Sequence, residues 1–155
     1  MPTIRNSAKA VLLDGAKILV TENRDREGIF YLLPGGGQES GETLTEALVR
    51  ECREETGLAV EVGSLLFVRE YIASHHEFAK SEPDVHQVEF LFSCQAAPRQ
   101  DLRNGVSPDH WQTGVEWLPL CSLLKARFYP AALKEPLLRW AKGDWQSPSY
   151  LGDVN

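Results

Sequence analysis

The chain has 155 residues, 43% of them apolar and 25% charged, and a formal net charge of −6. This size and balance predict one globular domain, residues 1–155, with its own hydrophobic core. They exclude a membrane protein, because no apolar run approaches the ~20 residues of a membrane span. No signal-peptide pattern is present, and the acidic balance argues against nucleic acid as a partner. Three widely spaced cysteines, Cys52, Cys94 and Cys121, favour free thiols and a cytoplasmic protein.

The first 40 residues predict a β-hairpin, a third strand and a glycine loop. Residues 8–13 and 17–21 are β-type runs joined by an Asp-Gly pair, which is a strong hairpin signal. Residues 30–33 form a third apolar run that stops at Pro34 and three glycines. Because proline lacks an N–H and glycine favours unusual backbone angles, we expect neither strand nor helix to continue through residues 34–37.

A helix is predicted next. Thr43 followed by Glu46 is a capping box, which starts a helix, and Gly57 is a natural C-terminal stop. The helix is therefore expected over residues 44–56.

The second half of the chain predicts further strands and two helices. Residues 58–73 hold one or two strands, 74–84 a polar loop and 85–95 another strand. A polar stretch, 99–113, leads to a strand at 115–118 and a short helix at 120–126, and a final amphipathic helix follows Pro130. The order β-β-β-α-β-β-β-α favours an α/β (α+β) fold in which a mixed sheet is covered by helices on both faces.

The first helix carries an acidic face. Its apolar stripe begins with Leu44 and Leu48 and continues into Glu51, Glu54 and Glu55. Such close carboxylates repel one another and resist desolvation, and a divalent cation relieves both costs. Oxygen ligands without paired Cys or His favour Mg²⁺ or Mn²⁺ over zinc. An acidic helix face is more often merely solvated, but the preceding glycine loop and the inward stripe favour a site.

These residues also fit a known motif. Gly36, five residues, Glu42, seven residues and then the run from Arg50 to Leu58 resemble the Nudix box, the signature of the Nudix hydrolase superfamily. All the fixed positions match across the box, and Cys52 stands where the family usually has an aliphatic residue. A small apolar cysteine is expected to pack normally there. The resemblance implies the family's α/β/α sandwich with a mixed, curved sheet.

The resemblance also implies an activity: metal-dependent hydrolysis of a phosphoanhydride in a nucleoside diphosphate linked to another group. ADP-ribose, a related ADP-sugar and a non-standard nucleoside triphosphate are candidate small-molecule substrates. By similarity, Glu51, Glu54 and Glu55 would bind Mg²⁺ or Mn²⁺ with help from a backbone carbonyl of the Gly35-Gly36 turn. Arg50 would orient these carboxylates and complete the catalytic set. Gly36, Gly37 and Glu42 would lie near the phosphates, and homodimers are frequent in the family.

The general base is left open, because family members differ in where it lies. A helix glutamate, Glu77, Glu89 or Glu116 is a candidate, and the last two are also candidate substrate contacts. The histidines around the variable loop and several aromatic residues add weaker candidates for phosphate contact and base stacking: His75, His76, His86, Tyr71, Phe78 and Trp111. Trp117 and Trp140 are expected to pack in the core.

Three other functions compete with hydrolysis. A nucleotide sensor would usually have lost part of the glutamate set, which is complete here. A prenyl-diphosphate isomerase would need a catalytic cysteine in the pocket, whereas Cys94 and Cys121 are expected to pack in the core. A plain structural domain would not need the complete box. The loops outside the box show no readable substrate motif, and Pro83 lies too far downstream to match the proline typical of ADP-ribose hydrolases.

Overall fold

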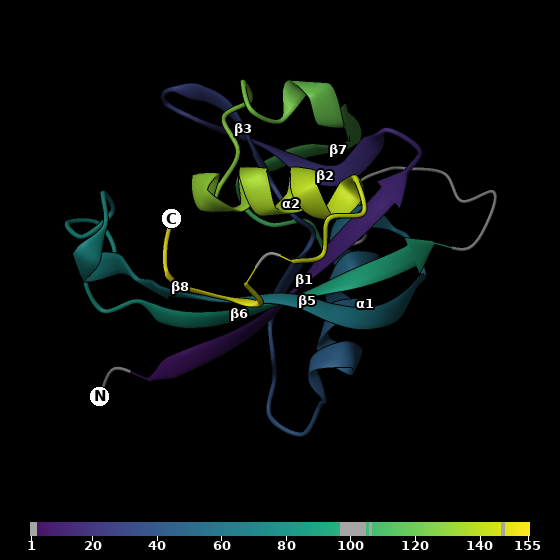
Figure 1. Cartoon of the computed structure of the whole chain (residues 1–155). Coiled ribbons are helices and arrows are strands. Elements are labelled where there is room, and N and C mark those ends of the chain that lie inside the picture. The colour runs from purple at the N-terminus through teal and green to yellow at the C-terminus, as the bar shows by residue number, and fades with distance from the viewer. Residues whose placement is uncertain (1–2, 97–104, 106, 147) are drawn as a thin grey trace.

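A computed structural model describes residues 3–96, 105, 107–146 and 148–155, and within them eight strands form one mixed sheet between two α-helices (Figure 1). The sheet order is β3-β2-β1-β6-β5-β8, with β4 paired to β1 and β7 paired to β2. The strands are β1 (Ile4–Asp14), β2 (Lys17–Asp25), β3 (Gly28–Leu32), β4 (Gly35–Gly37), β5 (Val60–Ile72), β6 (His86–Ala96), β7 (Gln112–Pro119) and β8 (Tyr150–Asp153). The helices are α1 (Leu44–Thr56) and α2 (Lys134–Ala141). The predicted α/β/α arrangement is confirmed.

The predicted hairpin is present, and its two strands are longer than expected, although they pair with each other only beside the turn. β1 and β2 pair antiparallel with Leu13 opposite Ile18 and Asp14 opposite Lys17. Gly15 takes a φ of 57°, the left-handed conformation that a tight turn needs and that glycine adopts without steric cost.

The glycine loop differs from its prediction. Gly35–Gly37 forms β4, which pairs antiparallel with β1 through Ser7–Gly37, Ala8–Gly36 and Lys9–Gly35, so the expectation of no strand there was wrong. Pro34 removes only its own N–H, while the glycines keep theirs and can pair. A side chain at Gly35 would collide with the Ala8 carbonyl, so the close approach requires glycine.

The helix α1 has the predicted bounds. The Thr43 side chain accepts a hydrogen bond from the Glu46 N–H, and the Glu46 side chain accepts one from the Thr43 N–H. Gly57 ends the helix at a φ of 73° and donates its N–H to the Arg53 carbonyl. Local sequence signals therefore set both ends of the element that carries the acidic face.

The second half of the chain departs from prediction in two places. Residues 58–73 give the single strand β5, within the prediction of one or two strands, with β6 antiparallel to it and parallel to β1. The helix expected at 120–126 is wrong: a single 3₁₀ turn, Leu120–Ser122, is followed by turns, because the chain bends to bury Leu123 and Phe128. β8 was not predicted, since four residues around Gly152 carry too little pattern. The polar stretch 99–113 lies partly outside the described residues.

Two hydrophobic clusters lie on opposite faces of the sheet. In β1, Ala8, Ala10 and Leu12 pack in the cluster with α1, whereas Val11 packs in the cluster with α2. Successive strand side chains point to opposite faces, so β1 supplies both cores. Trp117 and Trp140 are half-buried against these clusters, which confirms their packing role. Within the described part of the chain, neither helix has the length and apolar character to span a membrane.

Candidate functional site

The three glutamates of the acidic face have very different environments. Glu55 is 3% exposed, whereas the Glu51 and Glu54 side chains are 15% and 35% exposed. Because α1 packs on β1 through Leu48 and Cys52, the end of its apolar stripe carries Glu55 inward against β4. The exposure of the three carboxylates thus rises from Glu55 through Glu51 to Glu54.

The Glu55 carboxylate is fixed on the glycine strand. Its Oε2 accepts a hydrogen bond of 2.9 Å from the Gly35 N–H. Burial raises the pKa of Glu55 to about 8, although the positive charge of Lys9 and the Gly35 hydrogen bond act in the opposite direction. A carboxylate in this position is poorly compensated when ionised, and a cation placed beside it would stabilise its charged form.

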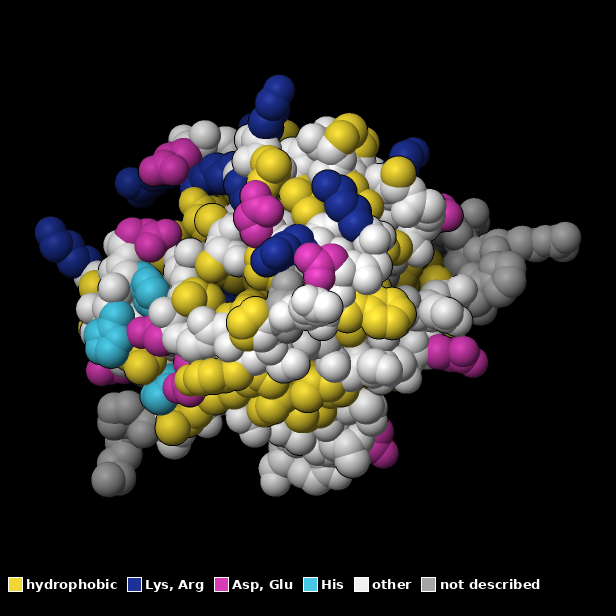
Figure 2. Space-filling model, in the orientation of Figure 1, with side chains coloured by type: hydrophobic (Ala, Val, Ile, Leu, Met, Phe, Trp, Pro, Cys, Tyr) yellow, Lys and Arg dark blue, Asp and Glu magenta, His cyan; other side chains and the backbone are white. Residues whose placement is uncertain are grey.

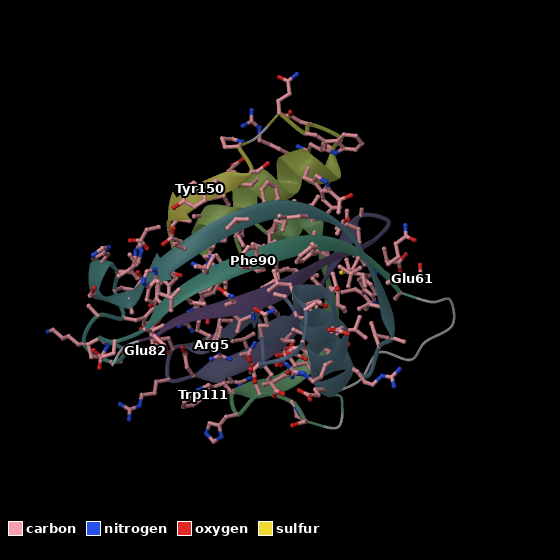
Figure 3. All side chains as sticks on the ribbon, turned by 90° about the horizontal axis from the view of Figure 1, so that it is seen from below. Arg5, Glu61, Glu82, Phe90, Trp111 and Tyr150 are labelled. Atoms are coloured by element: carbon pink, nitrogen blue, oxygen red, sulfur yellow. The ribbon has the colours of Figure 1, made fainter. Side chains whose placement is uncertain are left out.

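Gly36 brings backbone against a second glutamate. A Cβ atom built on Gly36 would lie 2.5 Å from the carboxylate carbon of Glu51, so a side chain there would push the Glu51 carboxylate away from the strand. At the next position, the guanidinium of Arg5, which is labelled in Figure 3, lies over Gly37. The three glycines thus let carboxylates and a guanidinium approach the backbone closely.

Arg50 links the acidic face to the loop before it. Its guanidinium donates to Glu42 Oε1 at 2.7 Å, to Glu51 Oε1 at 2.9 Å and to Glu54 Oε2 at 3.3 Å, and also to the Gly37 carbonyl at 3.0 Å. The hydrogen bond from Arg50 holds the pKa of Glu42 below its usual range. Glu42 also accepts from the Glu39 N–H, so loop, helix and glycine strand meet at one guanidinium.

A lysine lies at the same strand. The Lys9 Nζ donates to the Gly35 carbonyl at 2.8 Å, on the residue whose N–H binds Glu55. Its positive charge also acts on the buried Glu89 of β6. Lys9 was not among the predicted site residues, although a lone lysine inside an apolar strand is an unusual feature.

The helix glutamates and the carbonyls of the glycine strand offer carboxylate and carbonyl oxygens, the ligands that a hard divalent cation prefers. As the side chains stand in the described residues, no three of His, Cys, Asp and Glu are grouped to hold a metal. Arg50 lies on Glu51 and Glu54, and Lys9 lies on the Gly35 carbonyl. The residues fit a metal in type, and their side chains would have to rearrange to bind it.

The segment before β7 closes the C-terminal end of α1. Gly105 donates its N–H to the Glu55 carbonyl at 3.0 Å, and Ser107 donates to the Glu54 carbonyl at 3.0 Å. The Gln112 Nε2 also donates to the Glu55 carbonyl, at 2.7 Å. These bonds satisfy the last carbonyls of the helix, which have no partner inside it, and so steady the two glutamates.

The candidate bases outside the box lie in other surroundings. Glu89 is 5% exposed and ion-paired with Arg69 of β5; burial opposes ionisation, but Arg69 and Lys9 hold its pKa below the ordinary value. Glu116 lies on β7 opposite Val20 and accepts a hydrogen bond from Tyr31, in the β2–β3–β7 part of the sheet. Glu77 accepts a hydrogen bond from Asn155. None of these three is among the carboxylates held by Arg50 or the Gly35 N–H.

The three histidines around the 74–84 segment all contact carboxylates. His75 and His76 contact the two oxygens of Asp153 at 2.7 Å each, and His86 contacts Glu70 at 3.1 Å. Figure 2 shows the histidines grouped with acidic side chains at one edge of the molecule. His75 and His76 join the segment after β5 to β8, and His86 joins β6 to β5.

The three aromatic candidates lie in different surroundings. Phe78 packs edge-on against Tyr129, which packs edge-on against Phe30. Tyr71 is buried and stacked on His76, and its hydroxyl has no hydrogen-bond partner within the described chain. Trp111 is 59% exposed beside His110 and is labelled in Figure 3.

Two of the three cysteines pack as predicted. Cys52 and Cys94 are buried in the cluster with α1, where burial raises the pKa of both thiols. Cys121 is exposed on the 3₁₀ turn after β7, so the prediction that it packs in the core was wrong.

Comparison with known proteins supports one family. The model of the NUDIX domain matches residues 3–141. The ADP-ribose pyrophosphatase of Methanocaldococcus jannaschii is 32% identical over 141 residues, which cover 86% of this chain and 76% of that protein. A mouse protein, nucleoside diphosphate-linked moiety X motif 6, is 32% identical over 111 residues, which cover 72% of this chain. The match spans only 33% of the length of the mouse protein.

The fold has a close counterpart among solved structures. A NUDIX hydrolase from Nitrosomonas europaea superposes with a TM-score of 0.68 at 20% identity, covering 92% of this chain and 88% of that one. The NUDIX domain model covers residues 3–141, and the fold agrees with that match. The glutamate-bearing helix next to the glycine strand agrees with it as well. The chain therefore belongs to the NUDIX domain family.

Proposed function

We propose that this protein is a Nudix pyrophosphohydrolase that cuts a phosphoanhydride bond in a nucleoside diphosphate derivative, using Mg²⁺ or Mn²⁺. The observation that carries the proposal is the junction of α1 with β4. The buried Glu55 accepts from the Gly35 N–H, the half-buried Glu51 lies against Gly36, and the more exposed Glu54 is joined to Glu51 through Arg50. Such carboxylates are costly to keep together unless a cation binds them.

In this proposal Glu51, Glu54 and Glu55 hold the metal together with a carbonyl of Gly35 or Gly36. The bound ion would neutralise the charge of the diphosphate, activate a water and stabilise the leaving phosphate. Arg50 positions Glu51 and Glu54 through hydrogen bonds, and Glu42 fixes Arg50 in turn. The glycine strand lets the phosphates approach the backbone.

The general base is assigned to the helix glutamates. Glu89 is unsuited to accept a proton, because Arg69 and Lys9 stabilise its ionised form and its oxygens already bind Arg69 and Gln87. Glu116 and Glu77 lie against Tyr31 and Asn155. Glu54, the most exposed carboxylate of the set, is the best placed to meet a water from solvent.

For the substrate we propose ADP-ribose or a related ADP-sugar. Support comes from the 32% identity to an archaeal ADP-ribose pyrophosphatase over most of both chains. The proposed surface for the base is the cluster of Phe30, Phe78 and Tyr129, in which the Arg127 guanidinium already lies over Phe30 and Tyr129. We further propose that residues 1–155 act as a single cytoplasmic domain on this small molecule.

The test is product release from nucleoside diphosphate derivatives and nucleoside triphosphates with Mg²⁺, with Mn²⁺ and with a chelator. Metal-dependent cleavage of an ADP-sugar, abolished by the chelator, is the expected result. Cleavage confined to nucleoside triphosphates would replace the substrate but keep the reaction class. Tight nucleotide binding without any cleavage would favour a sensor instead.

The isomerase alternative receives no support from the described cysteines. Cys52 and Cys94 are buried under α1 with raised thiol pKa values, so neither is a good nucleophile. Cys121 is exposed on the turn after β7 and is not among the residues that surround the glycine strand.

A further inference from the structure

We infer that Lys9 is a built-in competitor of the metal: its ammonium group occupies the Gly35 carbonyl in the metal-free protein and lowers the affinity of the site for a divalent cation. This inference rests on the proposed function, because it assigns a role to Lys9 in the same site. It concerns a residue outside the Nudix box.

The position of Lys9 follows from strand pairing. In β1, Lys9 lies opposite Gly35 of β4 on one side and opposite Leu91 of β6 on the other. Gly35 has no side chain, so the lysine can fold back and place its Nζ 2.8 Å from the Gly35 carbonyl. The lysine is half-buried between two strands, which keeps its ammonium near that carbonyl.

The charges around the lysine explain why a cation is held there. Glu55, bound to the Gly35 N–H, and Glu89, on β6, are both almost fully buried, and the charge of Lys9 favours the ionised form of each. Arg69 already compensates Glu89, whereas no described arginine or lysine forms an ion pair with Glu55. Lys9 is therefore the protein's own partial counter-charge for the metal-binding carboxylate.

We take the Gly35 oxygen, which Lys9 already binds, as the carbonyl ligand of the metal. Two cations a few ångströms apart in a half-buried site repel each other strongly. Metal binding must therefore displace Lys9, and the displacement subtracts from the affinity of the site. The opposite reading, in which Lys9 merely braces the Gly35 strand, predicts the reverse sign: loss of the lysine would loosen the carbonyl and weaken metal binding.

The effect of Lys9 on metal affinity is measured by titrating metal-free protein with Mn²⁺ and following free Mn²⁺ by electron paramagnetic resonance. The titration is run in mildly alkaline, oxygen-free buffer without substrate. Lys9→Met keeps the length of the side chain and removes the charge, and Lys9→Gln repeats the change with a polar side chain. Lys17→Met is the matched control, because Lys17 is exposed at the start of β2 beside the hairpin turn.

We expect both Lys9 variants to bind Mn²⁺ with a Kd about tenfold lower than wild type, and Lys17→Met to stay within about twofold. Near-ultraviolet circular dichroism confirms that each variant is folded. An unchanged or higher Kd in the folded Lys9 variants would overturn the inference.

The result also separates this inference from the proposed function. If wild type binds metal and hydrolyses substrate but the Lys9 variants bind no tighter, only the inference fails. If wild type neither binds nor hydrolyses and the Lys9 variants bind, competition is supported and the proposed hydrolysis fails. If no variant binds Mn²⁺, both are overturned.

Discussion

Glu55 and Glu89 are both almost fully buried, at 3% and 5% exposed, yet their pKa values are shifted in opposite directions. Burial opposes ionisation in each case. At Glu89 the Arg69 guanidinium is an ion-pair partner and Gln87 adds a hydrogen bond, so the carboxylate stays charged. At Glu55 the direct partner is a backbone N–H, and burial prevails.

The difference shows how to distinguish a structural carboxylate from one that awaits a ligand. A buried glutamate with its own guanidinium is complete as it stands, and its loss should affect the fold. A buried glutamate beside glycine backbone, with no ion-pair partner among the described residues, is incomplete until a cation arrives. Its loss should affect activity and leave the fold intact. Four predictions test this contrast.

The largest effect is expected at Glu55. Glu55→Gln should lower kcat by several orders of magnitude, because an amide of the same shape is a poor metal ligand, and Glu54→Gln should do the same. The metal-free protein should melt as wild type does, since the amide oxygen can still accept from Gly35. Steady-state kinetics and thermal unfolding measure the two quantities. Glu61→Gln, on an exposed residue of β5, is the control. Near-normal turnover in both variants would refute the metal assignment.

Glu89 should behave in the opposite way. Glu89→Leu leaves the Arg69 guanidinium buried without its carboxylate, which should cost about 3–5 kcal/mol in the free energy of unfolding measured with urea. The double variant Glu89→Leu with Arg69→Met should recover part of this loss. A cost below about 1 kcal/mol for the single variant would show that the pair is not the structural partner described above.

Arg50 should show an intermediate effect on activity. Arg50→Lys keeps one charge but cannot hold Glu42, Glu51 and Glu54 at the same time. The expected loss in kcat/KM is roughly tenfold to a hundredfold, with a smaller change in melting temperature. Equal activity of Arg50→Lys and wild type would mean that the charge alone, and not the fork of hydrogen bonds, orients the glutamates.

The smallest effect is expected at Asp153, at the far edge of the sheet. Burial opposes its ionisation, but hydrogen bonds from His76, the Ile72 N–H and His75 lower its pKa from 3.8 to about 2. Because the folded-state pKa is depressed, this stabilisation is present above pH 3.8 and is lost as the pH falls towards 2. Asp153→Asn should lower the melting temperature at neutral pH by roughly 2–4 °C. If its acid-induced loss of stability between these two pH values equals that of wild type, the assignment is wrong.

Local chemistry in the sequence determined the helix and its acidic face. Thr43, Glu46 and Gly57 satisfy the helix ends within a few residues, so the bounds of α1 could be predicted without any tertiary information. The hairpin turn at Gly15 was equally local. The spacing of the Nudix box was enough to nominate Glu51, Glu54, Glu55 and Arg50.

Only the tertiary structure decided which of these groups is buried and what each one meets. The pairing of Gly35–Gly37 with β1 joins residues 26 to 30 positions apart in the sequence, and it places the Gly35 N–H on Glu55 and the Gly35 carbonyl on Lys9. The Arg69–Glu89 pair and the contacts of β8 depend likewise on strand neighbours that lie far apart in the sequence. Propensity and spacing act over a few residues, whereas burial and charge compensation are set by whatever the folded sheet brings alongside.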